Sequence, residues 1–305
     1  MSISAAIHAY TLWMVTLVQL RVIDAVRRHG SVTAAATELR YAQPSISHHL
    51  SRLEAQTGAR LLQRVGRGIR LTEAGRLLAD RAAEIIGRVD SATAELSTLV
   101  GLNAGRVRLA GFGSVMSSLV PQAAAILAQQ HPGLELGLTD AHPEDALQQL
   151  RAGHVDVAVI FRYDDTAPED DSIRLFHLLD DPLFLLTTGG GTTLTEHKDT
   201  PWIAGCERCR SHLVEMCEQA GFSPRLAYTT DDMVVMQTLV AAGMGVTTIP
   251  GLALRAHRDP AITATRLPVP PRQIYAATYG EPPDPPATAA LVGALTQAAT
   301  THHQV

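Results

Sequence analysis

The 305-residue sequence predicts an α/β protein with an N-terminal winged helix-turn-helix head, a long linker helix and a body of two α/β lobes. Three observations lead to this prediction. Residues 31–54 have the pattern of two short helices joined by a tight turn, apolar residues recur every seven positions after Leu78, and strand and helix patterns alternate from Arg106 onwards. A chain of this length and ordinary apolar content can form two or three compact units, each with its own core.

The head begins with a helix whose apolar residues share one face. Leu17, Leu20, Ile23 and Val26 have helical spacing, and Gly30 is a typical helix stop. This helix is expected to form the floor of the head.

Two further helices follow in the head. Thr33 is expected to cap the first, and the alanines at 34–36 are small enough for close helix packing. Pro44 suits the first turn of the second helix, which has one apolar stripe and a polar face that could reach a DNA major groove. The stripe consists of Ile46, Leu50 and Leu53, and the polar face of Ser45, His48, His49 and Arg52.

A β-hairpin wing is predicted next. Gly58 ends the preceding helix, and two short apolar stretches between Leu61 and Leu71 flank a glycine-containing turn. Arginines on this hairpin would lie along DNA phosphates or in a minor groove; the alternative is that they are simply solvated charges. These arginines are Arg64, Arg67 and Arg70.

A long helix is predicted after Thr72. Its apolar residues form two sets with a seven-residue period, which indicates a coiled-coil seam and therefore a dimer. The alternative is an amphipathic helix packed against its own chain, but no preceding domain offers an obvious surface for it. The first set is Leu78, Ile85, Ala92 and Leu99, and the second is Ala82, Val89 and Leu96.

The body has the strand and helix alternation of a parallel sheet with crossover helices. In the first lobe, strands are predicted at 107–111, 134–139 and 155–161, and helices at 119–131 and about 143–152. In the second lobe, strands are predicted at 183–187, 202–204, 225–229 and 246–249, and helices at about 208–220 and 233–242. Residues 273–279 and a helix from about 287 to 299 return to the first lobe.

Charge is distributed unevenly between these parts. Residues 1–72 contain nine arginines and three acidic residues, a net charge of +6, so the remaining chain carries −11 of the total of −5. A basic head on an acidic body suits phosphate binding by the head alone. The predicted boundaries are an extension at 1–13, the head at 14–73, the linker helix at 74–102 and the body at 103–305, with lobe 1 at about 106–178 and 270–300 and lobe 2 at about 180–268.

Motifs in the head and in the body resemble those of the LysR-type transcriptional regulators. The head pattern of the family is matched by Ala35, Ala36, Leu39, Gln43, Pro44, Ser47, Leu50, Leu53 and Glu54. Ala42 departs from that pattern where the family usually has a hydroxyl residue, and Leu62 replaces the usual Phe. In the body, residues 153–159 and 239–246 match family signatures.

The resemblance implies a homodimer or a dimer of dimers that binds an interrupted inverted repeat near a promoter, dimerises through the linker helix and has RNA polymerase as a possible partner. It also implies a two-lobed body like the type 2 periplasmic binding proteins, with a small-molecule effector held between the lobes. No catalytic residue, metal, other cofactor or membrane contact is expected. The DNA-binding candidates are Thr33, Gln43, Pro44, Ser45, Ser47, His48, His49, Arg52, Arg64, Arg67 and Arg70.

Ligands of such folds bind where the strands end at the cleft. Arg162 could pair with a carboxylate ligand or be neutralised by Asp164 or Asp165, and His142 could be a ligand contact or only a helix cap. The resemblance adds Ser114 and Thr230, which lie in loops that commonly touch effectors. The complete set of effector-binding candidates is Gly113, Ser114, Asp140, His142, Arg162, Cys206, Thr230 and Asp231.

The three cysteines suggest an alternative kind of regulator. Cys206, Cys209, His212 and Cys217 have spacings compatible with a metal site, and the first two alone could form a redox pair. Cys217 would lie about 12 Å along a helix from Cys209, which is too far for one ion. Cys217 is therefore expected in the core and the other two at the pocket, with redox or metal sensing through Cys206 and Cys209 as the alternative function.

Two other classes of protein are disfavoured. An enzyme would be expected to show a nucleotide-binding glycine loop or a catalytic triad context, and a solute-binding protein should carry a signal segment and lack a basic head. The apolar stretch at 5–23 has no basic n-region and no cleavage site, and polar residues interrupt it. The sequence thus predicts a cytoplasmic protein, whose true start is either Met1 or Met14.

Overall fold

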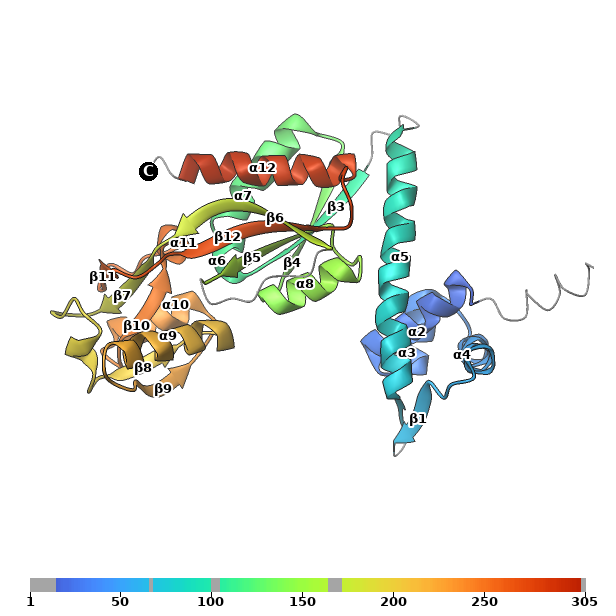
Figure 1. Cartoon of the computed structure of the whole chain (residues 1–305), viewed down its shortest axis with the longest axis horizontal. Coiled ribbons are helices and arrows are strands. Elements are labelled where there is room, and N and C mark those ends of the chain that lie inside the picture. Colours follow the sequence, from blue (N-terminus) through green and yellow to red (C-terminus); the bar gives the residue numbers. More distant parts are fainter. Residues whose placement is uncertain (1–14, 66–67, 100–104, 164–171, 303–305) are drawn as a thin grey trace, which may run out of the picture. The chain divides into compact units, whose positions relative to one another are not determined.

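The computed structural model describes residues 15–65, 68–99, 105–163 and 172–302 (Figure 1). The predicted extension at 1–13 and Arg67 lie outside these residues. The chain divides into two compact units, which are described separately. The first runs to Gly101 and takes in Gln148–Val155, and the second comprises Leu102–Leu147 and Asp156–Val305.

Three helices form the head: α2 (Leu17–His29), α3 (Val32–Leu39) and α4 (Gln43–Thr57). A capping box between Thr16 and Gln19 starts α2, and Gly30 ends it with a φ of 61°, a left-handed conformation that glycine adopts without steric cost. Gly58 ends α4 in the same way, as predicted from the sequence.

The prediction that Thr33 caps α3 is wrong. Ser31 occupies the N-cap position, and its hydroxyl accepts a hydrogen bond from the backbone N–H of Ala34 at 3.3 Å. Thr33 lies one residue inside the helix, where its carbonyl accepts a hydrogen bond from the Thr37 hydroxyl. The helix starts earlier than predicted because a serine directly before it can satisfy its first free N–H groups.

The predicted apolar stripe of α4 is confirmed, because Ile46, Leu50 and Leu53 are buried in the core of the head. The wing follows as an antiparallel hairpin of β1 (Leu62–Val65) and β2 (Gly68–Leu71). The Glu54 carboxylate on α4 accepts hydrogen bonds from the backbone N–H groups of Leu61 and Leu62, at 2.7 and 3.2 Å. This side chain therefore connects α4 to the wing.

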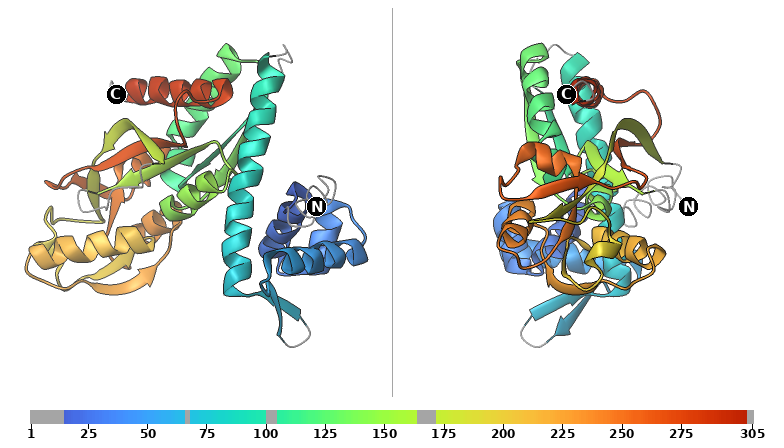
Figure 2. Two further views of the ribbon diagram at one scale, coloured as in Figure 1. Left: turned by 45° about the vertical axis from the view of Figure 1, so that its right-hand side comes forward. Right: turned by 90° about the vertical axis from the view of Figure 1, so that its left-hand side faces the viewer.

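The long helix is α5 (Glu73–Leu99; Figure 2). It begins where the Thr72 hydroxyl accepts a hydrogen bond from Gly75 N. Its first half packs against α2, with Ala79 and Ala82 buried in the core of the head. The assignment of Ala82 to a dimer seam is therefore wrong, because this small residue lets α5 approach α2 closely. The later seam positions Ile85, Val89 and Leu96 are 45%, 39% and 62% exposed in the single chain.

The second unit contains lobe 1, whose sheet has the strand order β4-β3-β5-β12-β6 (Figure 1). Its strands are β3 (Gly105–Gly111), β4 (Leu134–Asp140), β5 (Val157–Arg162), β6 (Ile173–Asp181) and β12 (Arg272–Tyr279). Strands β3, β4 and β5 are parallel, as predicted, whereas β12 pairs antiparallel with both of its neighbours, β5 and β6. Strand β6 was not predicted. Helices α7 (Leu119–Gln130) and α12 (Pro286–His302) pack together over the core, and α6 (Gly113–Met116) and α8 (Pro143–Arg151) are shorter.

Lobe 2 is built on two small sheets. The antiparallel sheet has the order β10-β7-β11, with β7 (Leu183–Thr187), β10 (Thr247–Pro250) and β11 (Thr263–Arg266), and the parallel pair consists of β8 (Pro201–Ala204) and β9 (Arg225–Thr229). The helices are α9 (Glu207–Gln219), α10 (Met233–Ala241) and α11 (Gly251–Ala256), with a short 3-10 turn η1 (Thr195–His197). Trp202 and Cys217 are fully buried in this lobe, so the predicted core position of Cys217 is confirmed.

The lobes are joined where β6 continues into β7 and β11 continues into β12 (Figure 1). At this junction the guanidinium of Arg272, which is 2% exposed, donates hydrogen bonds to Asp181 Oδ2 at 2.7 and 3.0 Å and to Ser114 Oγ at 2.7 Å. Asp181 Oδ1 accepts a hydrogen bond from the backbone N–H of Leu252 at 2.9 Å. One buried ion pair therefore connects α6 of lobe 1, both crossing strands and α11 of lobe 2.

Among the described residues, none of the helices is both long enough and apolar enough to cross a membrane.

The core of the head gives a direct stability prediction. Leu53→Ala is expected to lower the free energy of unfolding of the head by about 2–5 kcal/mol, because it leaves a cavity among fully buried side chains. The matched control Leu77→Ala removes a side chain that is 62% exposed on α5 and should cost about 0.5 kcal/mol or less. Hydrogen exchange of the α2 and α4 amides in the full-length protein measures both, and equal losses would contradict the described core.

Candidate functional sites

The candidate DNA-binding face is formed by α3, α4 and the wing. Five of the predicted residues on α4 are exposed to solvent, and Thr33 is exposed on α3. Ser45 and His49 on α4 are half-buried. The ring of His49 packs edge to face on that of Tyr41, with the ring centroids 6.0 Å apart. The five exposed residues are Gln43, Pro44, Ser47, His48 and Arg52.

Arg64 and Arg70, the two wing arginines within the described residues, do not share a face of the hairpin. Arg64 pairs with Ile69 across the hairpin and Arg70 pairs with Gln63, so the two arginines belong to neighbouring cross-strand pairs. Because successive residues of a strand point to opposite faces, Arg64 and Arg70 lie on opposite faces of the wing.

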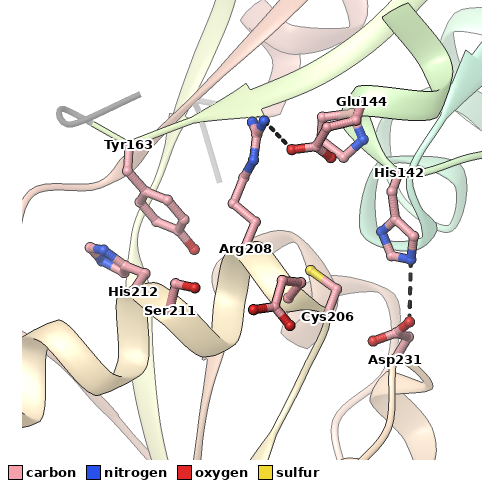
Figure 3. Close-up of a pocket in the computed structure, with 10 residues that line it drawn as sticks. His142, Glu144, Tyr163, Cys206, Arg208, Ser211, His212 and Asp231 are labelled. Atoms are coloured by element: carbon pink, nitrogen blue, oxygen red, sulfur yellow. Dashed lines mark hydrogen bonds and ion pairs between the residues drawn. The ribbon is translucent and has the colours of Figure 1, made fainter. Parts of the chain in front are cut away.

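The candidate effector site is a cavity of about 670 Å³ between the two lobes (Figure 3). Lobe 1 contributes residues from the start of α8 and the end of β5, and lobe 2 contributes the first turns of α9 and the loop before α10. The lining residues are His142, Pro143, Glu144, Tyr163, Cys206, Glu207, Arg208, Ser211, His212 and Asp231. A second, smaller cavity of about 60 Å³ shares His142, Cys206 and Asp231 but is otherwise mostly apolar.

Three polar contacts cross the cavity from one lobe to the other. Arg208 of α9 forms an ion pair with Glu144 of α8 (Figure 3). It also donates a hydrogen bond to the carbonyl of Phe161 at 2.8 Å. His142 Nε2 lies 3.2 Å from Asp231 Oδ2. Since His142, Glu144 and Asp231 are exposed, the Arg208–Glu144 and His142–Asp231 contacts can break and re-form at little cost.

One wall of the cavity is aromatic. The ring of Tyr163 stacks on His212 with centroids 3.7 Å apart and an interplanar angle of 13°. Burial, reinforced by the nearby Cys209, raises the pKa of Tyr163 far above its usual value. Tyr163 therefore stays a neutral phenol.

The two cavity cysteines lie side by side. Cys206 is the N-cap residue of α9, and its sulfur is 3.2 Å from that of Cys209, one turn into the helix. A hydrogen bond from Cys209 lowers the pKa of Cys206 to about 6, against the opposing effect of burial, with further help from the backbone N–H of Cys209 and from His142. The same hydrogen bond, together with burial, raises the pKa of Cys209. In the described part of the chain, His, Cys, Asp and Glu side chains form no group of three that could hold a metal ion.

The structure brings four of the predicted effector residues to these cavities: Gly113, His142, Cys206 and Asp231. Ser114 is instead fully buried and holds Arg272. Asp140 is exposed at the end of β4, and the Thr230 hydroxyl accepts a hydrogen bond from Asp232 N beside α10. Neither of these two residues lines either cavity.

Arg162 also lies outside both linings, and its neighbours Phe161 and Tyr163 take its place. The alternation of side chains along β5 explains this difference, because consecutive residues face opposite sides of the sheet. The predicted residues did not include Glu144, Tyr163, Arg208 or Arg272. The alternation could have identified Tyr163, but no local pattern distinguishes the others from surface charges.

The Cys206 thiol gives a pH prediction. Its alkylation by iodoacetamide in the full-length protein should accelerate with rising pH with a midpoint of about 6, because only the thiolate reacts. The control is Cys217, whose pKa burial raises to about 11 and which should stay unreacted over the same range. Peptide mass spectrometry measures both rates, and a midpoint near the free-cysteine value of about 8.5 would show the assigned environment to be wrong.

Two family models match the chain. The LysR substrate binding domain matches residues 101–300, and the bacterial regulatory helix-turn-helix protein of the lysR family matches residues 17–76. Among curated relatives, the HTH-type transcriptional regulator YfeR of Shigella flexneri, described as uncharacterized, is 26% identical over 270 residues, covering 85% of this chain and 86% of its own. The RuBisCO operon transcriptional regulator of Allochromatium vinosum is 33% identical over 172 residues, covering 56% and 55%.

Solved structures agree with the fold. Full-length CbnR, a regulator crystallised with its target DNA, has a TM-score of 0.66 at 22% identity, covering 93% of this chain and 100% of that one. Together the two matched domains account for the head and nearly all of the body. This chain therefore belongs to the LysR family of DNA-binding transcriptional regulators with an effector-binding domain.

Proposed function

We propose that this regulator binds an interrupted inverted repeat near a promoter as a homodimer or dimer of dimers, and that a small molecule in the 670 Å³ cavity controls it. The observation that carries the proposal is the set of exposed cross-lobe contacts around that cavity. From its DNA site the protein would regulate transcription in the cytoplasm, in contact with RNA polymerase.

The head supports the DNA-binding part of the proposal. Residues 1–72 carry a net charge of +6, which favours phosphate binding, and α4 presents Arg52 and His48 on an exposed face opposite its buried stripe. A helix with this division fits the major groove, with its polar residues at the base edges. The relative CbnR was crystallised with its target DNA.

The dimer is supported by α5. Ile85, Val89 and Leu96 are large apolar residues at the spacing of a coiled-coil seam, and each is more than a third exposed. Burying them against a second copy would remove apolar surface from water. Two heads on a twofold axis would then match an inverted repeat and act at a higher effective concentration.

The effector is best described by the groups that line the cavity. Arg208 is held by Glu144, so an anionic ligand that replaces this carboxylate would keep the guanidinium paired while removing one link between the lobes. A ligand that binds one arrangement of the lobes more tightly shifts the population towards it. The head positions of a dimer would change with that shift.

The first test concerns DNA. Arg52→Ala or His48→Ala is expected to weaken binding to the promoter region of a regulated gene by about 5- to 150-fold, equivalent to about 1–3 kcal/mol, because a base or phosphate contact is lost. Arg106→Ala is the control, since this arginine is exposed on β3 of the body. Fluorescence anisotropy at fixed salt gives the affinities. If both head variants bind like the wild type, α4 is not the recognition helix.

The second test concerns the cavity. Small carboxylic acids and sugar phosphates are screened for compounds that raise the melting temperature of the wild-type protein. Arg208→Gln should abolish the shift, because it removes the charge that holds the anion, whereas Arg255→Gln on α11 should keep it. A shift that survives Arg208→Gln and is lost in Arg255→Gln would place the effector elsewhere.

A further inference from the structure

We propose that Cys206 and Cys209 are a reversible redox modification site, which forms a disulfide by exchange with a low-molecular-weight disulfide and thereby resets the cross-lobe contacts of α9. This inference adds a covalent input to the non-covalent effector of the proposed function. The disulfide itself rests on the geometry of α9, and only its regulatory consequence rests on the proposed function.

The geometry of the pair is close to that of a disulfide. Both cysteines are free, and their sulfurs are 3.2 Å apart, compared with about 2.04 Å in a disulfide bond. Cys206 lies just outside the first turn of α9 and Cys209 lies within it. A small movement at a helix end, where the backbone is least constrained, is enough to join them.

The two thiols have different access to the cavities. Cys206 lines both, so a small disulfide entering the larger cavity can reach its sulfur (Figure 3). Cys209 lines only the smaller one. Cys206 is therefore the attacking thiol and Cys209 the resolving thiol, a division that agrees with the lowered pKa of Cys206 and the raised pKa of Cys209.

The thiol–disulfide exchange takes place in two steps. The Cys206 thiolate attacks one sulfur of the disulfide RSSR, forms a mixed disulfide and releases RS⁻. The Cys209 thiol gives its proton to the released RS⁻, attacks Cys206 Sγ and expels a second RS⁻, which takes up a proton from water. The two protein thiols are thus oxidised by two electrons, and RSSR is reduced to two RSH.

The charged groups around the pair explain how oxidation would affect the lobes. His142 and Asp231 face Cys206, and Arg272 and Tyr163 face Cys209. A disulfide removes the negative thiolate beside His142, which pairs with Asp231 across the lobes. The disulfide also draws together Cys206 and Cys209, which lie on either side of Arg208 in the sequence. The contacts of Arg208 to Glu144 and to the Phe161 carbonyl join α9 to lobe 1.

The experiment uses the full-length protein equilibrated in glutathione buffers of increasing oxidised fraction, followed by alkylation of free thiols and peptide mass spectrometry. A Cys206–Cys209 linkage should accumulate with the oxidised fraction and disappear with dithiothreitol. Cys209→Ser should instead trap glutathione on Cys206, and Cys206→Ser should leave Cys209 alkylated. Cys217→Ala, altered in the core of lobe 2, should behave like the wild type.

Several results would overturn the inference. The site is refuted if both thiols remain free in fully oxidised glutathione, if the linkage forms only after unfolding in urea, or if Cys209→Ser traps no glutathione. A linkage that leaves the melting temperature and DNA affinity of the wild type unchanged would refute the effect on the lobes. Absence of specific DNA binding in both redox states would instead contradict the proposed function, since the linkage is read by mass spectrometry alone.

Discussion

The buried ion pair between Arg272 and Asp181 is the interaction on which the arrangement of the two lobes depends. Charges of this kind are tolerated in a protein interior only when they are paired and hydrogen-bonded. Here Asp181 accepts bonds from Arg272 and from Leu252 N, and Arg272 also donates to Ser114. Its guanidinium lies over the rings of Phe112 and Phe161, 5.0 and 4.8 Å from their centroids. The pair thus holds elements of both lobes at the point where the chain crosses between them.

The cleft between the lobes therefore has a fixed base, the buried Arg272–Asp181 pair, and a rim of exposed contacts that can change. Arg272 lines the smaller cavity, whereas the Arg208–Glu144 ion pair and the hydrogen bond between His142 and Asp231 lie around the larger one. Exposed pairs contribute about 0–1 kcal/mol each, and breaking a buried pair costs about 3–5 kcal/mol. A ligand or a disulfide at the rim can therefore alter the cross-lobe contacts without separating the lobes at their base.

The sequence predicted those elements that are marked by a pattern of neighbouring residues. The stripe of Ile46, Leu50 and Leu53 and the glycine that ends α4 follow from helical periodicity and glycine conformation, and both are confirmed. The packing of Ala82 on α2 was missed because a small residue suits a coiled-coil seam and a close helix contact equally well. In the cleft, His142 was placed by its position after a strand and Cys206 by the spacing of the cysteines, but Arg208 and Arg272 act through partners far away in sequence. No periodicity encodes such pairs.

A double-mutant cycle on Arg272 and Asp181 tests the central role of the buried pair most directly. Arg272→Met, Asp181→Leu and the double variant are compared by chemical denaturation of the full-length protein, with hydrogen exchange of the β6 and β12 amides reporting on the body. Each single variant should lose about 3–5 kcal/mol, and the double variant should lose clearly less than their sum, because no charge is then left buried alone. Losses that simply add would show that the two side chains act independently and would contradict this account.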